Sequence, residues 1–497
     1  MAAEKQLLFA NARRPFPALA AIGVVLAVTI PLAYVLNIWQ DEAFTLQTTS
    51  RGLSYAFAQS VRFEQNAPLY FLLLTLWRHL NDSVFFLRVF SILCAALTVW
   101  LVPGISRRYV PRADPVLSTF AVAWNPFLIW AALEMRAYAL IVVMSALLLL
   151  TFFDGFLTPR TRPVKTALYF VCAIACLYTQ YYFAFLIAAQ AVAVALYRPR
   201  AFMRFAVVAA VTVLAFAPMI AIVPGQVANF RGAFTPPHSV FVSAAVLAGI
   251  LLRYVLALMV PHATALYAAL IAGVVAACII ARRAFSANGD SVLLVITASA
   301  AAFFAAGVYV AGVHVLNRHA ASLYVPAVLG IFAGLTFLRP RFRAAAAIAW
   351  FALAMSASSI ALVQTYAALA KPGDWIRATA YLRAHERAGE PVVVFEAENA
   401  LPFAYYYRGP NRIVAIPHGV DFRRYDVTRF VIHGESELRG SMPRADHLWL
   451  VTAGECTAAN ISFGCDALER FVARRYCVAS DAKFYLSRLR LLKRAPC

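Results

Sequence analysis

The most constraining feature of this sequence is an alternation of long apolar stretches with short clusters of arginine. Residues 1–370 contain nine of the 23 carboxylates, and residues 371–497 contain the other fourteen. Charged residues make up 13% of the chain, whereas a soluble protein carries roughly 25%. This composition excludes a cytosolic enzyme, a disordered scaffold and a small secreted module held by disulfides. We therefore predict that most of the chain lies in a lipid bilayer.

The chain divides into two parts near Lys371. Residues 1–370 are predicted to form a transmembrane body with outer loops at 39–83 and 225–261. Residues 371–497 have the mixed charge of a water-soluble α/β domain. In that domain the patterns predict a helix over 374–388 and strands over 391–395, 412–416 and 447–452.

The arginine clusters mark loops on the inner side of the membrane, because inner loops carry an excess of Lys and Arg. The apolar stretches between them predict a polytopic α-helical membrane protein with about eleven transmembrane helices, near residues 17–38, 84–104, 115–132, 138–156, 166–180, 183–197, 205–224, 262–281, 291–312, 320–338 and 344–366. The first helix is interpreted as retained, since no signal-peptidase site follows it. An odd number of spans puts the N-terminus inside and the C-terminal domain outside.

The stretch 239–260 is apolar enough to be a twelfth span, which would reverse the side of the C-terminal domain. We interpret it as an interfacial or re-entrant helix, because polar residues including Gln226, Asn229, Arg231 and His238 surround it.

The eight cysteines fall into two groups. Four lie in apolar runs and are expected to be small core residues, namely Cys94, Cys172, Cys176 and Cys278. The other four lie in the tail and are candidates for disulfides, namely Cys456, Cys465, Cys477 and Cys497. Pairing the first with the second and the third with the fourth is the most local of three connectivities. Zinc binding is less favoured, because the CxxC spacing is absent.

The few carboxylates of the membrane body stand out because an unpaired charge in lipid is costly. Asp41 and Glu42 follow Trp39 at the outer end of the first predicted helix. The simplest interpretation of this pair is a helix end at the interface. Further polar clusters occur at other outer ends, in the runs 64–70 (EQNAPLY), 134–138 (EMRAY), 180–182 (QYY) and 317–319 (NRH). We predict that all of them converge on one cavity.

These runs resemble the integral-membrane glycosyltransferases of the GT-C superfamily, most of all the family 39 branch of protein mannosyltransferases and the lipid A aminoarabinose transferase. The resemblance rests on residues 39–44 (WQDEAF), 66–74 (NAPLYFLLL), 88–91 (RVFS), 134–138 (EMRAY) and 318–326 (RHAASLYVP). It covers essentially the whole membrane body. The resemblance implies sugar transfer from a polyprenyl-phosphate carrier, with Asp41 at the family's essential acidic position. The chain departs from the family pattern at Asn66, Gln180 and His319, where relatives often have Lys or His, His, and Tyr.

The chemistry of such a transfer assigns roles to these residue types. A carboxylate can act as general base toward the acceptor hydroxyl, typically worth 10² to 10⁴-fold, and Asp41 is our candidate with Glu42 beside it. The leaving phosphate needs positive charge, which Arg136 and Arg318 are expected to supply. The predicted binding set for donor phosphate and substrate comprises Asn66, Tyr70, Arg88, Glu134, Arg136, Tyr138, Tyr181, Tyr182, Arg318 and His319. No cofactor is required, and a divalent cation at Asp41 or Glu42 is an alternative.

The predicted partners are a polyprenyl-phosphate sugar donor, a glycolipid, cell-wall glycan or protein acceptor, and membrane lipid. The predicted location is a bacterial inner membrane, with a periplasmic C-terminal domain. A transporter or lipid flippase is the alternative function, although such proteins usually place ionisable groups near the middle of the bilayer. Nucleic acid is not expected, because the basic residues of the tail, including the run 488–494, are largely balanced by acids.

Overall fold

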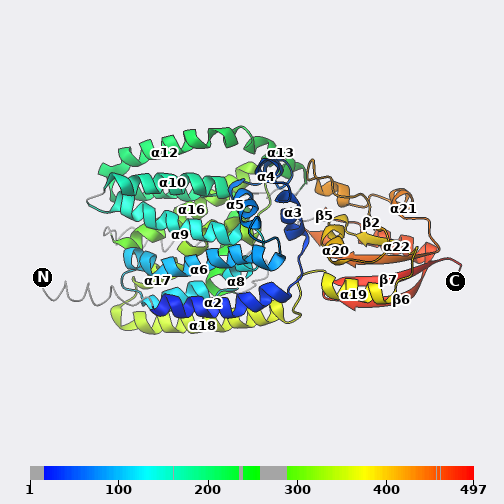
Figure 1. The fold of residues 1–497 in the computed structure, drawn as a ribbon. Helices are drawn as coiled ribbons and strands as arrows, with labels where there is room; N and C mark the ends of the chain where they lie inside the picture. Colours follow the sequence, from blue (N-terminus) through cyan, green and yellow to red (C-terminus); the bar gives the residue numbers. More distant parts are fainter. Residues whose placement is uncertain are drawn as a thin grey trace.

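The computed structural model describes residues 16–159, 162–233, 239–257, 288–454, 456–458 and 461–496. A body of roughly parallel helices lies beside a smaller unit that contains a β-sheet (Figure 1). The C-terminus lies at the far end of the sheet-containing unit, away from the helical body. The fold is therefore a polytopic helical membrane protein with a C-terminal α/β unit, as the sequence predicts.

Within the described residues, seven helices are long and apolar enough to cross a membrane, or eight if one bent pair counts as a span. The seven are α2 (Phe16–Val35), α6 (Val84–Tyr109), α9 (Tyr138–Phe152) with the π-helical turn η2 (Phe153–Leu157), α12 (Pro199–Ile220), α16 (Gly289–Ala311), the 3₁₀ turn η3 (Asn317–Leu323) with α17 (Tyr324–Leu335), and α18 (Pro340–Tyr366). The bent pair is α7 (Pro115–Ala123) and α8 (Pro126–Ala132), which meet at 54°.

The predicted count of eleven spans is not confirmed. Besides α5 (Leu69–Arg78) of the loop 39–83, three described apolar helices of 10–17 residues are shorter than these spans, namely α10 (Pro163–Thr179), α11 (Phe183–Tyr197) and α14 (Val240–Leu256). The first two correspond to predicted spans 166–180 and 183–197, while α14 corresponds to the stretch interpreted as interfacial. Inward residues of α14, such as Leu247 and Tyr254, are buried in the helical body. The predicted span 262–281, with Cys278, lies outside the described residues.

Local sequence signals fix where several of these helices begin. The Ser83 hydroxyl accepts a hydrogen bond from the Phe86 amide at the start of α6, and Asp114 caps α7 through the amides of Val116 and Leu117. Asn125 caps α8 in the same way. A side-chain oxygen at these positions satisfies backbone donors that the helix leaves unpaired. In α7 and α8 a proline follows the cap, where its missing N–H costs nothing.

The outer loop predicted at 39–83 is folded into three short helices, α3 (Gln40–Thr48), α4 (Leu53–Arg62) and α5 (Leu69–Arg78). They lie at the end of the helical body that faces the α/β unit (Figure 1). The second region predicted as an outer loop, 225–261, overlaps α13 (Val223–Ala233) and α14. This arrangement places α3, with Asp41 and Glu42 in its first turn, between the membrane helices and the α/β unit (Figure 1).

The α/β unit is built on a five-stranded sheet with the order β2-β1-β3-β7-β6. The strands β1 (Val392–Phe395), β2 (Ile413–Ala415) and β3 (His447–Ala453) are parallel and match the three predicted strands. The strands β6 (Tyr476–Phe484) and β7 (Ser487–Arg494) form an antiparallel pair that the sequence analysis did not predict. Short helices complete the unit, namely α19 (Trp375–His385), η4 (Ala397–Asn399), α20 (Ala400–Tyr406), η5 (Val427–Phe430), α21 (Glu435–Ser441) and α22 (Cys465–Arg475).

The basic run 488–494 is strand β7 and not a free cationic patch. Leu489 and Leu492 are buried in the cores of this unit. Arg488 pairs with Asp481 at 2.6 Å, and Arg490 pairs with Glu469 at 2.7 Å. Ion pairs to neighbouring elements therefore neutralise two of the three arginines of the strand.

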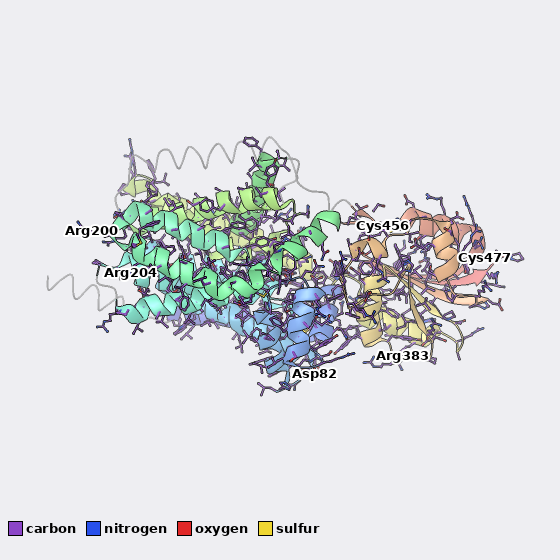
Figure 2. The ribbon with its side chains drawn as sticks, turned by 90° about the horizontal axis from the view of Figure 1, so that it is seen from above. Asp82, Arg200, Arg204, Arg383, Cys456 and Cys477 are labelled. Atoms are coloured by element: carbon purple, nitrogen blue, oxygen red, sulfur yellow. A yellow bond between two sulfur atoms is a disulfide. The ribbon has the colours of Figure 1, made fainter. Side chains whose placement is uncertain are left out.

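A disulfide joins Cys456 to Cys465, with the Cα atoms 5.7 Å apart. It closes the small hairpin of β4 (Thr457–Ala458) and β5 (Ile461–Ser462). Cys477 is also disulfide-bonded, and Cys497 lies outside the described residues. Both labelled cysteines, Cys456 and Cys477, lie in the α/β unit in Figure 2.

Candidate active site

Glu42 lies in a buried group of contacts with Arg88, Met135 and Lys371, here called the clamp. It lies in the first turn of α3 and is fully buried. Arg88 of α6 donates from Nε at 3.1 Å and from Nη2 at 2.9 Å to the two carboxylate oxygens. The backbone N–H of Met135 and Lys371 Nζ also contact the carboxylate, at 3.1 and 2.9 Å. Because four donors occupy its oxygens, Glu42 has no free acceptor site for a substrate proton.

Arg88 also closes the end of α2. Its remaining N–H groups donate to the carbonyl oxygens of Ala33, Leu36 and Asn37 at 2.7–3.0 Å. These carbonyls lie at and beyond the last turn of a helix, where backbone acceptors lack partners. Burial raises the pKa of Glu42, but Arg88 and Lys371 lower it further, to about 2. The pair therefore fixes the turn that leads to Asp41 and leaves neither residue available to a ligand.

Lys371 joins the α/β unit to this clamp. Its ammonium lies 2.9 Å from both Glu42 and Glu134, and it donates to the Leu133 carbonyl at 2.9 Å. Glu134 in turn accepts a 2.5 Å hydrogen bond from the indole of Trp39. Burial raises the pKa of Glu134 to about 7, in spite of the opposing charge of Lys371. Sequence reasoning treated Lys371 only as a domain boundary, and no local motif marks it.

Arg136 forms a second buried ion pair, with Glu64. Its Nη1 atom lies 2.6 Å from Glu64 and 3.0 Å from the Thr45 hydroxyl. Thr48 donates to the other oxygen of Glu64 at 3.1 Å. Burial raises the pKa of Glu64 although Arg136 lowers it. Arg136 therefore ties α3 to the loop before α5.

Asp41 and Arg318 form the accessible pair of the site. Arg318 Nη1 lies 3.1 Å from Asp41 Oδ2, and the side chains keep 26% and 15% of their surface exposed. The guanidinium also lies over the ring of Trp39, with Cζ 5.8 Å from the centroid. By contrast, Glu42, Glu64 and Glu134 expose 3% or less of their side chains. Asp41 is thus the acid with the most accessible side chain in the network that the structure describes.

The tyrosines are divided between this network and the apolar core. Tyr138 stacks on Trp130 at 4.8 Å, and its phenol interacts with the charges of Arg318, Arg136 and Asp41. Tyr70 is fully buried in a cluster of apolar residues beside Phe71. The structure therefore brings Tyr138 to the site and makes Tyr70 a core residue next to it.

Within the residues that the structure describes, four other predicted binding residues make no hydrogen bond, ion pair or ring contact with Asp41 or with the side chain of Arg318, namely Asn66, Tyr181, Tyr182 and His319. Asn66 is exposed and donates to the Glu64 carbonyl at 2.7 Å, which shapes its own loop. Tyr182 lies 6.1 Å from the ring of His319, and Tyr181 packs against Phe216. His319 Nδ1 accepts a hydrogen bond from the Leu316 backbone at 3.1 Å. Of these residues, His319 is the neighbour of Arg318 in the chain, and Tyr182 is linked to Arg318 through the His319 ring.

Comparison with known proteins tests the fold. No protein-family model matches the sequence, and no curated protein matches it either. The structure of ArnT from Cupriavidus metallidurans bound to undecaprenyl phosphate aligns with 95% of this chain and 97% of its own, with TM-score 0.57 and 12% identity. The apo form of the same ArnT aligns with 95% of this chain and 98% of its own, with TM-score 0.53 and 12% identity. The chain has the ArnT fold.

This result confirms, at the level of fold, the resemblance found in the sequence, because the chain shares the fold of ArnT. The alignment covers both the helical body and the α/β unit, since nearly all of each chain is included. AglB from Archaeoglobus fulgidus, in complex with an inhibitory peptide and a dolichol-phosphate, aligns with 87% of this chain and 69% of its own, at 11% identity and TM-score 0.45.

In this ArnT fold, the α/β unit contributes two residues to the site that sequence reasoning missed. Tyr425 packs its ring 6.0 Å from Phe44 and 5.9 Å from Phe63, and its hydroxyl donates to Glu398 at 2.7 Å. Glu398 is buried and interacts with the charges of Asp41 and Arg318. Burial raises its pKa to about 7. A carboxyl in a 3₁₀ turn of the α/β unit has no sequence signature that could have revealed this position.

The tyrosine run 405–407, whose sequence is compatible with a strand or with a cover for the site, lies at the end of α20. Tyr406 accepts a 2.9 Å hydrogen bond from the Ile38 backbone and so holds α20 against the entry to α3. Among the residues that the structure describes, no group of three or more His, Cys, Asp or Glu side chains is arranged to hold a metal ion.

Proposed function

We propose that this protein is a membrane glycosyltransferase that moves a sugar from a polyprenyl-phosphate donor to an acceptor hydroxyl at the outer membrane surface. The observation that carries the proposal is the Asp41–Arg318 pair, which keeps accessible surface at the centre of an otherwise buried network. The ArnT fold supports the assignment, because ArnT was crystallised with undecaprenyl phosphate. The position of the acids at one end of the helices argues against a transporter.

In the proposed reaction the acceptor oxygen attacks the anomeric carbon and the bond from that carbon to the phosphate oxygen breaks. The acceptor proton passes to a carboxylate, and Asp41 is our candidate. The lipid phosphate leaves as an anion and needs a cation, not a proton donor. Arg318 fits this role, since its guanidinium has further donors besides the one that contacts Asp41.

Donor binding would free the proposed base. The phosphate competes with Asp41 for Arg318, so that Asp41 becomes available to the acceptor as the donor enters. Arg136, Glu42 and Arg88 are proposed as positioning residues, because their polar atoms contact protein groups. Glu398 and Tyr425 are proposed to face the acceptor from the α/β unit.

A position in the membrane suits an enzyme whose donor carries a polyprenyl chain. Removing a polyprenyl chain from the bilayer costs about 0.8 kcal/mol per CH₂, so reaction at the membrane surface avoids that cost. We propose a bacterial inner membrane with the α/β unit in the periplasm. A phosphatase reporter at the C-terminus should be active if the unit is periplasmic, and an inactive fusion with normal expression would reverse this topology.

The test of the activity uses the purified full chain in lipid nanodiscs. The protein is incubated with a panel of polyprenyl-phosphate hexoses and pentoses together with membrane extracts as acceptor, and conversion to free polyprenyl phosphate is followed by mass spectrometry. We expect conversion of at least one donor, dependent on the extract. Failure to convert any donor by protein that binds polyprenyl phosphate would overturn the proposed reaction.

A further inference from the structure

A groove between α10 and α12 lies at the opposite end of the helical body from the candidate active site. It encloses about 420 Å³ and is lined on the α10 side by Pro163, Ala167 and Phe170 and on the α12 side by Arg204, Val207 and Val211. Figure 1 shows α12 at the edge of the helical body with α10 beside it. Val207 and Val211 expose 55% and 42% of their surface. In a membrane this groove therefore faces lipid.

The apolar walls of the groove determine what can fill it. A cavity holds water only when several polar groups surround it, and here Val, Phe, Ala and Pro side chains form most of the wall. Packed acyl chains make up the surroundings at this depth. The part of the groove along Val207 and Val211 is therefore suited to a hydrocarbon chain.

Arg204 supplies the polar end of the groove. Its Nη2 atom donates to the Gly155 carbonyl at 2.9 Å, and its guanidinium lies over the ring of Phe156 at 5.3 Å. In the described part of the chain, this carbonyl is the one acceptor that the structure gives Arg204. A guanidinium has five N–H donors, so most of them stay available to an anion.

The neighbouring charges favour the same kind of ligand. Arg198 and Arg200 are exposed and have no ion-pair partner among the described residues. The nearest acid in sequence, Asp154, is already paired with Arg108 at 2.7 Å and Lys165 at 3.4 Å. Figure 2 shows Arg200 and Arg204 together at this end of the body, far from the α/β unit. The mouth of the groove thus carries unbalanced positive charge.

The spacing along α12 matches a lipid that enters from the membrane surface. At about 1.5 Å per residue, Arg204 lies roughly 7 Å inside Pro199 and Val211 lies roughly 18 Å inside it. A headgroup at the arginines would therefore place an acyl chain along Val207 and Val211. That depth reaches about half of the ~30 Å hydrocarbon core.

We propose that the α10–α12 groove is a binding site for one anionic glycerophospholipid of the arginine-rich leaflet, with its phosphate on Arg204 and Arg200 and one acyl chain between Phe170 and Val211. The site is separate from the proposed sugar-transfer site and does not depend on that activity. A lipid bound in this groove would hold α12, at the edge of the helical body (Figure 1), against α10. Basic pockets between membrane helices bind anionic headgroups in this manner.

The experiment compares lipid binding to the full chain by native mass spectrometry. Purified protein receives phosphatidylglycerol or phosphatidylcholine of identical chains, and the fraction with one bound lipid is measured. We expect a preference for phosphatidylglycerol that falls about fivefold in Arg204→Ala. Arg204→Lys keeps the charge and should retain the preference. Ala167→Phe fills the groove and should lower the binding of both lipids to the same extent, so that the ratio of bound phosphatidylglycerol to bound phosphatidylcholine stays the same.

Matched controls separate the groove from general surface charge. Arg341 at the start of α18 is an exposed arginine that does not line the groove, and Arg341→Ala should leave the ratio unchanged. Equal loss in Arg204→Ala and Arg341→Ala, or equal binding of the two lipids by the unmodified protein, would overturn the proposal. Displacement of phosphatidylglycerol by millimolar inorganic phosphate would also overturn it, since it would show a simple anion site.

Discussion

Arg318 and Asp41 are 277 positions apart in the chain, yet Arg318 Nη1 lies 3.1 Å from Asp41 Oδ2. The contact joins the turn before α17 to the first turn of α3. Both side chains keep part of their surface accessible. In the other acid–cation pairs of the network, each side chain keeps 11% or less of its surface exposed.

The accessible pair leads to the first prediction. Asp41→Asn keeps the shape of the side chain and removes the proton acceptor. We expect kcat to fall by about 10²-fold or more, with an unchanged thermal midpoint. The matched control is Asp82→Asn, which removes a carboxylate paired with Arg78 at the surface of the same outer region (Figure 2). Normal turnover by Asp41→Asn would exclude Asp41 as the base.

The buried clamp of Glu42 and Arg88 leads to a prediction on stability. Glu42→Gln leaves the Arg88 guanidinium buried without its counter-ion, and breaking such a pair costs about 3 kcal/mol or more. We expect a large drop in the thermal midpoint and in the yield of monodisperse protein. Arg88→Met should have a similar effect, whereas Asp82→Asn should change the midpoint little. If Glu42→Gln had the same thermal midpoint as the unmodified protein, the clamp would not contribute to stability.

Lys371 is expected to couple the α/β unit to the membrane body. Lys371→Met removes the cation shared by Glu42 and Glu134, which leaves two buried carboxylates without it. The double variant with Glu134→Gln removes one of these carboxylates, so it should regain part of the lost stability. Thermal midpoints of the two single variants and the double variant form a cycle with an expected coupling of about 1–3 kcal/mol. Simple additivity would show that Lys371 and Glu134 act independently.

Glu398 is expected to make stability depend on pH. Its pKa is raised from the ordinary 4.5 to about 7 by burial, so between these values the folded protein binds more protons than the unfolded chain. The free energy of unfolding should therefore fall as pH rises from 5 to 7, by up to about 3 kcal/mol from this group.

Glu398→Gln removes that titration, and we expect a flatter profile of thermal midpoint against pH. Glu435→Gln serves as the control, because it removes a carboxylate of the same unit that pairs with Arg474 at the surface. Parallel profiles for Glu398→Gln and the unmodified protein would contradict the burial argument. Glu134 has a raised pKa for the same reason, so some dependence should persist in the variant.

Local features of the sequence determined the broad architecture. Apolar length and scarce charge predict membrane helices, because lipid tolerates neither unpaired charge nor open backbone. The three parallel strands of the α/β unit were predictable as buried apolar runs. Strand β7 was not, because its alternating arginines are balanced by Asp481 and Glu469 from other elements.

Tertiary structure decided which of the polar residues are available for chemistry. Asp41 and Glu42 are adjacent in sequence, but successive residues of a helix point about 100° apart. Glu42 therefore faces Arg88 in the interior, while Asp41 faces Arg318 at the accessible side. Lys371 and Glu398 reach the site only because the α/β unit folds back onto α3. The sequence determines where the acids lie along the chain, and only long-range packing determines which cation each acid faces.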